Sequence, residues 1–126
     1  MSKKREDHEL PPVIQQGWRF HHLGLPVKEK HPDEYYLETF KMYVSGFDKN
    51  PFGIERMRFE PDSPVHSLIQ SQPHLAFEVD DLEAALAGRK IIGDIGSPSP
   101  GVRVAMIVDD GLPIELLEFD QKINNV

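Results

Sequence analysis

Two histidines and two glutamates occupy matching places in the two halves of the chain. His22 begins the sequence HLGLPVKE, and His74 begins the similar sequence HLAFEVDD. Downstream of each, Glu55 lies in GIERMRFE and Glu115 lies in PIELLEFD. Two matches in the same order, with metal-ligand residue types in register, indicate a duplicated module.

These four residues could bind a metal if the strands that carry them face one another. The leucine after each histidine and the isoleucine before each glutamate are expected in the core. Because side chains alternate along a strand, the histidines and glutamates then lie together on the strand faces that point away from this core. Imidazole and carboxylate ligands suit Zn²⁺, Ni²⁺, Co²⁺, Fe²⁺ or Mn²⁺. A lone strand histidine is more often structural, but packing does not require His and Glu at equivalent places in both halves. The same alternation predicts that His21 faces away from His22, as a structural or exposed residue.

The second half has the clearer pattern of secondary structure. A strand from His74 is followed by a capping-box pattern, Asp80 with Glu83, and by a short helix over residues 82–87 that Gly88 ends. Three more strands are predicted, and the tight turn 109–111 joins the last two. This half therefore has the element order β-α-β-β-β.

The first half is shorter between its histidine and its glutamate. Alternation over residues 18–27 predicts a strand, and the residues from His31 to Glu38 predict a short helix with a proline in its first turn. Strands are predicted at 40–44 and 52–59. This half has lost a strand or shortened its loops.

The sequence divides into an N-terminal arm and one domain. Residues 1–16 are polar and contain Pro11-Pro12, which indicates a loose N-terminal arm. The single domain then covers 17–126. Within it, module one spans 17–60, a linker rich in Pro, Asp and Ser spans 61–72 and module two spans 73–120.

Composition limits the partners. The chain has 126 residues, a formal net charge of -7 and no cysteine. The negative charge would repel nucleic acid and anionic membranes, and the longest strongly apolar run, 104–108, is too short to cross a bilayer. Neither nucleic acid nor a membrane is expected as a partner. The lack of cysteine excludes a disulfide framework and a thiolate metal site, so a cytoplasmic location is expected.

From Trp18 to Asp120 the motifs around these residues resemble the glyoxalase/bleomycin-resistance/dioxygenase group, also called the vicinal oxygen chelate superfamily. The matching motifs are those around His22, Ile54-Glu55, Pro73-His74 and Gly111 to Glu115, and the second-half motifs are the more specific ones. The resemblance implies an α+β fold in which tandem β-α-β-β-β modules, the first shortened, form a cupped mixed sheet. It also implies a divalent metal, Zn, Ni, Co, Mn or Fe, that binds two neighbouring oxygens of a small-molecule substrate.

The resemblance further implies roles for individual residues. The metal positions of glyoxalase I fall on His22, Glu55, His74 and Glu115. The implied activity is that of a metal-dependent lyase or isomerase, in which the metal polarises a carbonyl and stabilises an enediolate-like intermediate. A carboxylate would move the proton, with Glu115 as the first choice and Glu55 as the second. A homodimer is also implied.

Two alternatives remain open. In an extradiol-type iron dioxygenase, His22, His74 and Glu115 alone would form a two-histidine, one-carboxylate site. The presence of Glu55 argues against this dioxygenase, because a fourth protein ligand would fill a coordination position of the iron that oxygen chemistry needs open. A metal-free protein that binds a small, drug-like molecule is the second alternative, although such relatives typically lack the four ligands.

Overall fold

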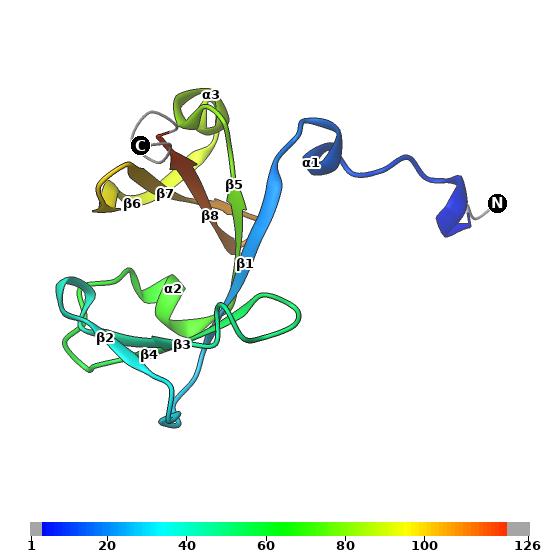
Figure 1. The fold of residues 1–126 in the computed structure, drawn as a ribbon. Helices are drawn as coiled ribbons and strands as arrows, with labels where there is room; N and C mark the ends of the chain where they lie inside the picture. Colours follow the sequence, from blue (N-terminus) through cyan, green and yellow to red (C-terminus); the bar gives the residue numbers. More distant parts are fainter. Residues whose placement is uncertain (1–3, 121–126) are drawn as a thin grey trace.

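One eight-stranded mixed sheet organises the protein (Figure 1), whose computed structural model describes residues 4–120. The strand order across the sheet is β2-β3-β4-β1-β5-β8-β7-β6. The strands are β1 (Arg19–Pro26), β2 (Tyr35–Leu37), β3 (Met42–Ser45), β4 (Ile54–Phe59), β5 (His74–Glu78), β6 (Lys90–Ser99), β7 (Val102–Asp109) and β8 (Leu112–Phe119). The helices are α1 (Pro12–Gln15), α2 (Ser67–Ser71) and α3 (Leu82–Leu86), with 3-10 turns η1 (Arg5–Asp7) and η2 (Glu38–Phe40).

The two halves of the sheet are related by an internal repeat. The strands β1 and β5 pair antiparallel in the middle, and each has a parallel neighbour from its own half, β4 beside β1 and β8 beside β5. Gly24 pairs with Glu55, and its counterpart Ala76 pairs with Glu115. Both glutamates therefore lie at the same register relative to their histidines. The α+β fold of tandem modules in a curled mixed sheet, with a shortened first module, is confirmed.

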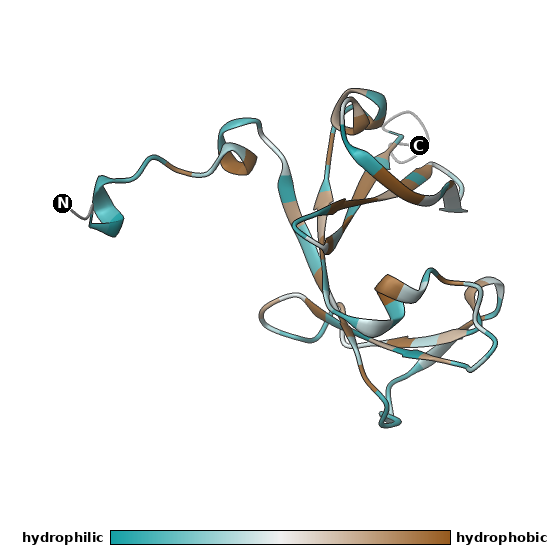
Figure 2. Ribbon diagram, turned by 180° about the vertical axis from the view of Figure 1, so that it is seen from behind, coloured by the Kyte–Doolittle hydropathy of each residue, from teal (hydrophilic) through white to brown (hydrophobic). Residues whose placement is uncertain are grey.

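The larger core lies in module two, beneath α3. Leu82 of α3 is fully buried against Leu116 of β8 and Ile107 of β7, and Trp18 packs against the edge of this cluster. Figure 2 shows hydrophobic stretches along the strands beside α3. Asp110 and Gly111 both have positive φ angles, 51° and 76°, which form the tight turn predicted between β7 and β8.

Helix α3 begins at Leu82 as predicted, but its N-cap differs from the one that the capping-box pattern predicts. Asp81, not Asp80, is the N-cap, and its carboxylate accepts a hydrogen bond from the backbone N–H of Ala84. The carboxylates of Asp80 and Glu83 instead pair with arginines of neighbouring strands. The capping-box prediction was therefore wrong, because strand arginines compete for these carboxylates. Gly88, with φ of 74°, follows the last turn as expected.

The helix predicted from His31 to Glu38 does not form. After a turn, Tyr35–Leu37 pairs with β3 as the strand β2, and the single 3-10 turn η2 follows it. Tyrosine favours strands, and the ring of Tyr36 packs 4.8 Å from that of Tyr43 across the pair. The shortening of module one has therefore removed its helix and not a strand.

The outer face of β4 explains why no helix is needed there. Leu116 in β8 is fully buried beneath α3, whereas Arg56 holds the equivalent position in β4. Arg56 pairs with Asp33, and Arg58 makes a bidentate pair with Glu34. A strand face covered by arginine-carboxylate pairs leaves no apolar surface for a helix to bury.

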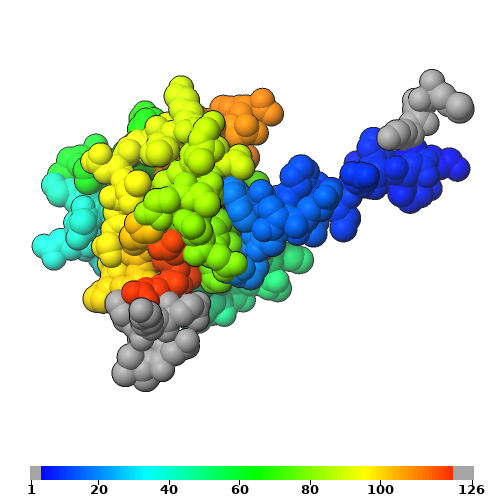
Figure 3. All heavy atoms as spheres, turned by 90° about the horizontal axis from the view of Figure 1, so that it is seen from above, coloured from blue at the N-terminus to red at the C-terminus, as the bar shows by residue number. Residues whose placement is uncertain are grey.

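The segments outside the two modules differ in their packing. The segment predicted as a linker contains α2, whose Ile69 is buried. The described part of the arm, residues 4–16, contains η1 and α1, and it extends away from the sheet (Figures 1 and 3). Within the described part of the chain, no helix is long and apolar enough to span a membrane.

We expect Asp81→Ala to lower the free energy of unfolding by about 1 kcal/mol, because it removes the N-cap of α3. Urea denaturation followed by circular dichroism measures this change. Asp80→Ala is the matched control, since it removes only an exposed ion pair with Arg19. Equal destabilisation by the two substitutions would contradict the assignment of the cap.

Candidate metal centre

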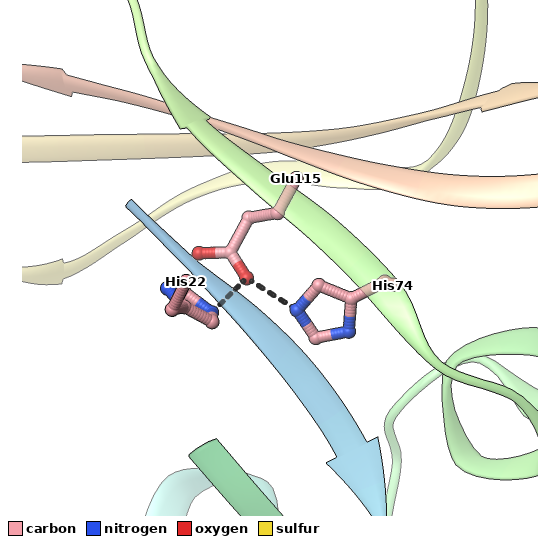
Figure 4. Close-up of side chains that lie close together, drawn as sticks. All are labelled: His22, His74 and Glu115. Carbon is pink, nitrogen blue, oxygen red and sulfur yellow. Dashed lines mark hydrogen bonds and ion pairs between the residues drawn. The ribbon is translucent and has the colours of Figure 1, made fainter. Parts of the chain in front are cut away.

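Three strands bring His22, His74 and Glu115 together in the middle of the sheet (Figure 4). The Nε2 atom of His74 lies 3.0 Å from Oε1 of Glu115, and the Nε2 atom of His22 lies 3.6 Å from the same oxygen. The two histidines are buried, with exposed fractions of 4% and 2%. Two imidazoles from equivalent positions of the two modules therefore converge on one carboxylate oxygen.

Glu55 lies at the edge of this group. Its Oε1 atom is 3.8 Å from Nε2 of His22, and its side chain is partly exposed. The three other residues have ligand atoms that all lie within 4.8 Å of one another, and Glu55 does not belong to that set. All four predicted residues thus lie on one side of the sheet, three in close contact and one beside them.

Gly24 makes room for the His74 ring. A Cβ atom at residue 24 would lie 2.1 Å from Cε1 of His74, a distance at which the two groups cannot coexist. Ala76 is the equivalent of Gly24 in module two. It is fully buried, and it pairs with His22 on the neighbouring strand. The glycine of the HLGL sequence is therefore explained by the close approach of an imidazole.

The contacts within the centre lower the pKa of Glu115 and raise the pKa of His22. Burial acts to raise the pKa of Glu115, but the two histidines outweigh it and lower that pKa to about 2. Burial acts to lower the pKa of His22, but its contact with Glu115 and the charge of Glu55 outweigh it, so that pKa is raised. The carboxylate of Glu115 is held as an anion between two imidazoles.

The carboxyl of Glu55 has the opposite character. Burial raises its pKa above the usual value, and the charge of Glu115 adds to this effect, while the histidines oppose it. The two carboxyl groups of the centre thus differ in proton affinity, as in sites that divide ligand and proton-transfer roles between two acids.

The residues fit a divalent metal. Metal bonds of about 2.1 Å place neighbouring ligand atoms roughly 3.0 to 3.4 Å apart in octahedral and tetrahedral shells. The contacts of 3.0, 3.6 and 3.8 Å among the four side chains approach these separations. Among residues 4–120, Nδ1 of His74 has no hydrogen-bond partner. Nδ1 accepts no hydrogen bond from these residues, so it can carry the ring hydrogen. In that tautomer Nε2 keeps its lone pair for a metal.

His21 does not face away from His22 as strand alternation predicts. The β1–β5 register shifts between Phe20 and His22, so that His21 is the extra residue of a β-bulge. Its Nδ1 atom lies 2.7 Å from Nδ1 of His22, and its ring stacks on Phe47. The predicted orientation of His21 was therefore wrong, because a bulge breaks the two-residue period.

A cavity of about 320 Å³ adjoins the centre. Its lining includes the aromatic residues Tyr35 and Phe47, the cationic Lys49, and the carboxylates of Asp33, Asp48 and Glu55. Phe47 also makes an edge contact with His22, with ring centroids 5.7 Å apart. The sequence did not identify Tyr35, Phe47 and Lys49 as lining residues, since they lie in β2 and in the turn after β3, where no motif marks them.

A second group of carboxylates, Asp81, Glu83 and Glu118, also has its oxygens close together. Arg103 donates hydrogen bonds to both Glu83 and Glu118, and Glu118 accepts from the backbone N–H of Leu82. Glu83 and Glu118 are therefore paired with an arginine, and Asp81 caps the helix by accepting from the N–H of Ala84. The group ties α3 to β7 and β8.

Comparisons with known proteins support the fold. No family model matches the sequence, and no curated protein matches it. Among solved structures, a hypothetical protein from Bacillus halodurans C-125 matches with a TM-score of 0.60 and 18% identity, covering 81% of this chain and 94% of that one. A methylmalonyl-CoA epimerase from Mycobacterium tuberculosis matches with a TM-score of 0.56 and 18% identity, covering 86% and 92%. The chain therefore shares the fold of these two proteins.

Gly24→Ala should displace the His74 ring. We expect a loss of about 1 to 3 kcal/mol in the free energy of unfolding, because the new methyl group overlaps a buried side chain. Gly96→Ala is the control, since a Cβ there meets nothing within 4 Å. Urea denaturation compares the two variants, and an unchanged stability of Gly24→Ala would contradict the close approach.

The charge pair of Glu115 and His22 should make the stability of the chelator-treated protein depend on pH. The lowered pKa of Glu115 stabilises the fold above its usual value of 4.5 and loses this effect as the pH falls towards 2. The raised pKa of His22 stabilises the fold below its usual value of 6.5 and loses this effect as the pH rises through the folded pKa.

The difference in melting temperature between wild type and Glu115→Gln should therefore be largest between pH 4.5 and 6.5. Thermal unfolding across a pH series measures it. A difference that stays constant from about pH 3 to about pH 9 would contradict the predicted interaction.

Proposed function

We propose that this protein is a metal-dependent isomerase or lyase of the glyoxalase type. The observation that carries the proposal is the convergence of two buried imidazoles on the carboxylate of Glu115, at distances of 3.0 and 3.6 Å. The name of one structural neighbour, methylmalonyl-CoA epimerase, belongs to an isomerase and gives the proposal further support.

His22, His74 and Glu115 would hold one divalent metal, with Glu55 as a fourth ligand or as a neighbour of the substrate. Two imidazoles and one or two carboxylates suit Zn²⁺, Ni²⁺, Co²⁺, Mn²⁺ or Fe²⁺. When bound, the metal would supply a Lewis acid that polarises a substrate carbonyl and stabilises an enediolate-like anion.

Glu55 is the better placed of the two carboxylates to move a proton. It lines the cavity, whereas the carboxylate of Glu115 lies between the two imidazoles. A small substrate in the cavity would therefore meet Glu55 beside its reacting carbon, and Glu55 would take the proton there and return it. This order of preference reverses the expectation from sequence, which put Glu115 first.

The surroundings would orient and shield the substrate. Tyr35 and Phe47 offer flat apolar walls, and Lys49 offers a cation to the polar end of a small molecule.

We propose a homodimer and a cytoplasmic location as well, on the family resemblance and on the absence of cysteine.

The closeness of three ligands also supports a second candidate. His22, His74 and Glu115 form the compact set, and Glu55 lies outside it, as in an iron site with two histidines and one carboxylate. Iron-loaded protein that consumes O₂ with a catechol would favour this extradiol dioxygenase over the isomerase. Absence of O₂ consumption would exclude it for the catechols used.

Metal content tests the proposal first. After chelator treatment and loading, we expect about one metal per chain in wild type and a loss of that metal in His74→Ala and Glu115→Ala, because each removes a ligand. His8→Ala, in the exposed arm, is the control and should keep the metal. Elemental analysis makes the measurement. No stoichiometric metal in wild type would instead support a metal-free protein that binds a small molecule by shape.

The role of Glu55 has its own test. Glu55→Gln should keep the metal but slow proton exchange with solvent deuterium by at least about 100-fold, because the amide cannot take a proton. Mass spectrometry of acyl thioesters, and of the hemithioacetals that 2-oxoaldehydes form with an added thiol, incubated with the loaded protein measures the exchange. Exchange at the wild-type rate would contradict the role of Glu55 as the base.

A further inference from the structure

His21 contacts the candidate metal centre without belonging to the ligand set. As the extra residue of the bulge in β1, it directs its Nδ1 atom at Nδ1 of His22, 2.7 Å away. Two ring nitrogens at this distance share one hydrogen, so that one ring donates and the other accepts. The direction of this hydrogen bond decides what the far nitrogen of His22 can do.

Only one direction leaves a neutral His22 able to bind a metal. If His22 donates from Nδ1, its Nε2 atom keeps a free lone pair beside Glu115. If His21 donates instead, neutral His22 carries its hydrogen on Nε2, facing Glu115 at 3.6 Å and Glu55 at 3.8 Å. The second arrangement has no lone pair to offer on that side.

Packing fixes the orientation of the His21 ring. The ring stacks on Phe47, with centroids 4.9 Å apart and planes 25° apart, and it also lies 5.8 Å from the ring of Phe119. Rings held on two sides have little rotational freedom, so that the acceptor atom stays aimed at His22. The bulge and the two phenylalanines therefore keep one imidazole against another.

We propose that His21 is a positioning residue that accepts the Nδ1 hydrogen of His22 and so keeps Nε2 of His22 free for a divalent metal. This inference rests on the proposed metal site. Metal-binding histidines almost always donate their second N–H to a fixed acceptor, and loss of that acceptor typically weakens metal binding 10- to 100-fold. His74 has no such partner among residues 4–120, so the two histidines of the centre are supported unequally.

Zinc affinity, measured by competition with a chelator, tests the proposal. His21→Phe keeps a stacking ring but removes the acceptor, and it should weaken binding about 10- to 100-fold. His21→Asn places an amide oxygen near the position of Nδ1, and it should bind within about threefold of wild type. His8→Phe, a change of the same residue types in the exposed arm, should leave the affinity unchanged.

The imidazole nitrogens provide a second readout that does not depend on activity. In nitrogen-15 NMR spectra of the zinc-loaded protein, His22 should carry its hydrogen on Nδ1, and this hydrogen should exchange slowly with water in wild type and in His21→Asn. In His21→Phe the exchange should become fast, because no acceptor remains. Protonation of Nδ1 on His21 in the wild-type protein would overturn the proposal, even if His21→Phe failed to fold.

The outcomes separate this proposal from the proposed function. Wild type that binds zinc, together with folded His21→Phe of equal affinity, would overturn the role of His21 and leave the metal site standing. Equal weakening by His21→Phe and His21→Asn would assign the effect to ring packing and would also overturn it. Wild type that binds no zinc would overturn both.

Discussion

The structure depends on the meeting of two imidazoles and one carboxylate where β1, β5 and β8 lie side by side. Burying an anion is unfavourable unless charged or hydrogen-bonding partners surround it, and His22 and His74 provide those partners for Glu115. The parallel pairing within each module and the antiparallel pairing between modules fix the register of the three strands. Gly24 then supplies the space that the His74 ring occupies.

The two modules share this centre but differ on their outer faces. In module two, Leu116 is covered by α3, and the strands need that helix to bury them. In module one, Arg56 and Arg58 pair with carboxylates on this face, and no helix covers it in the described part of the chain. The turn with Phe47 and Lys49 lies beside Glu55, and these three residues line the cavity. The shortened module therefore shapes the space in which a substrate would bind.

Much of this arrangement was readable from the sequence, and the failures have physical causes. The repeat of His and Glu predicted the paired modules, and it predicted that these strands would bring His22, His74 and Glu115 to one side of the sheet, because strand pairing preserves register between copies. Arg56 occupies the position in module one that Leu116 occupies in module two, and this difference indicates that module one lacks the covering helix. The helix-start pattern around His31 predicted a helix instead. The bulge at His21 and the partners of Asp80 and Glu83 depend on contacts across strands, which local patterns do not report.

The central claim is that both histidines and Glu115 bind one metal ion. X-ray absorption spectroscopy of protein loaded with one equivalent of zinc tests this most directly, because scattering from imidazole rings identifies histidine ligands. We expect two imidazole ligands in wild type and no bound zinc in His74→Ala. A coordination shell of oxygen atoms alone, such as Asp81, Glu83 and Glu118 would supply, would contradict it.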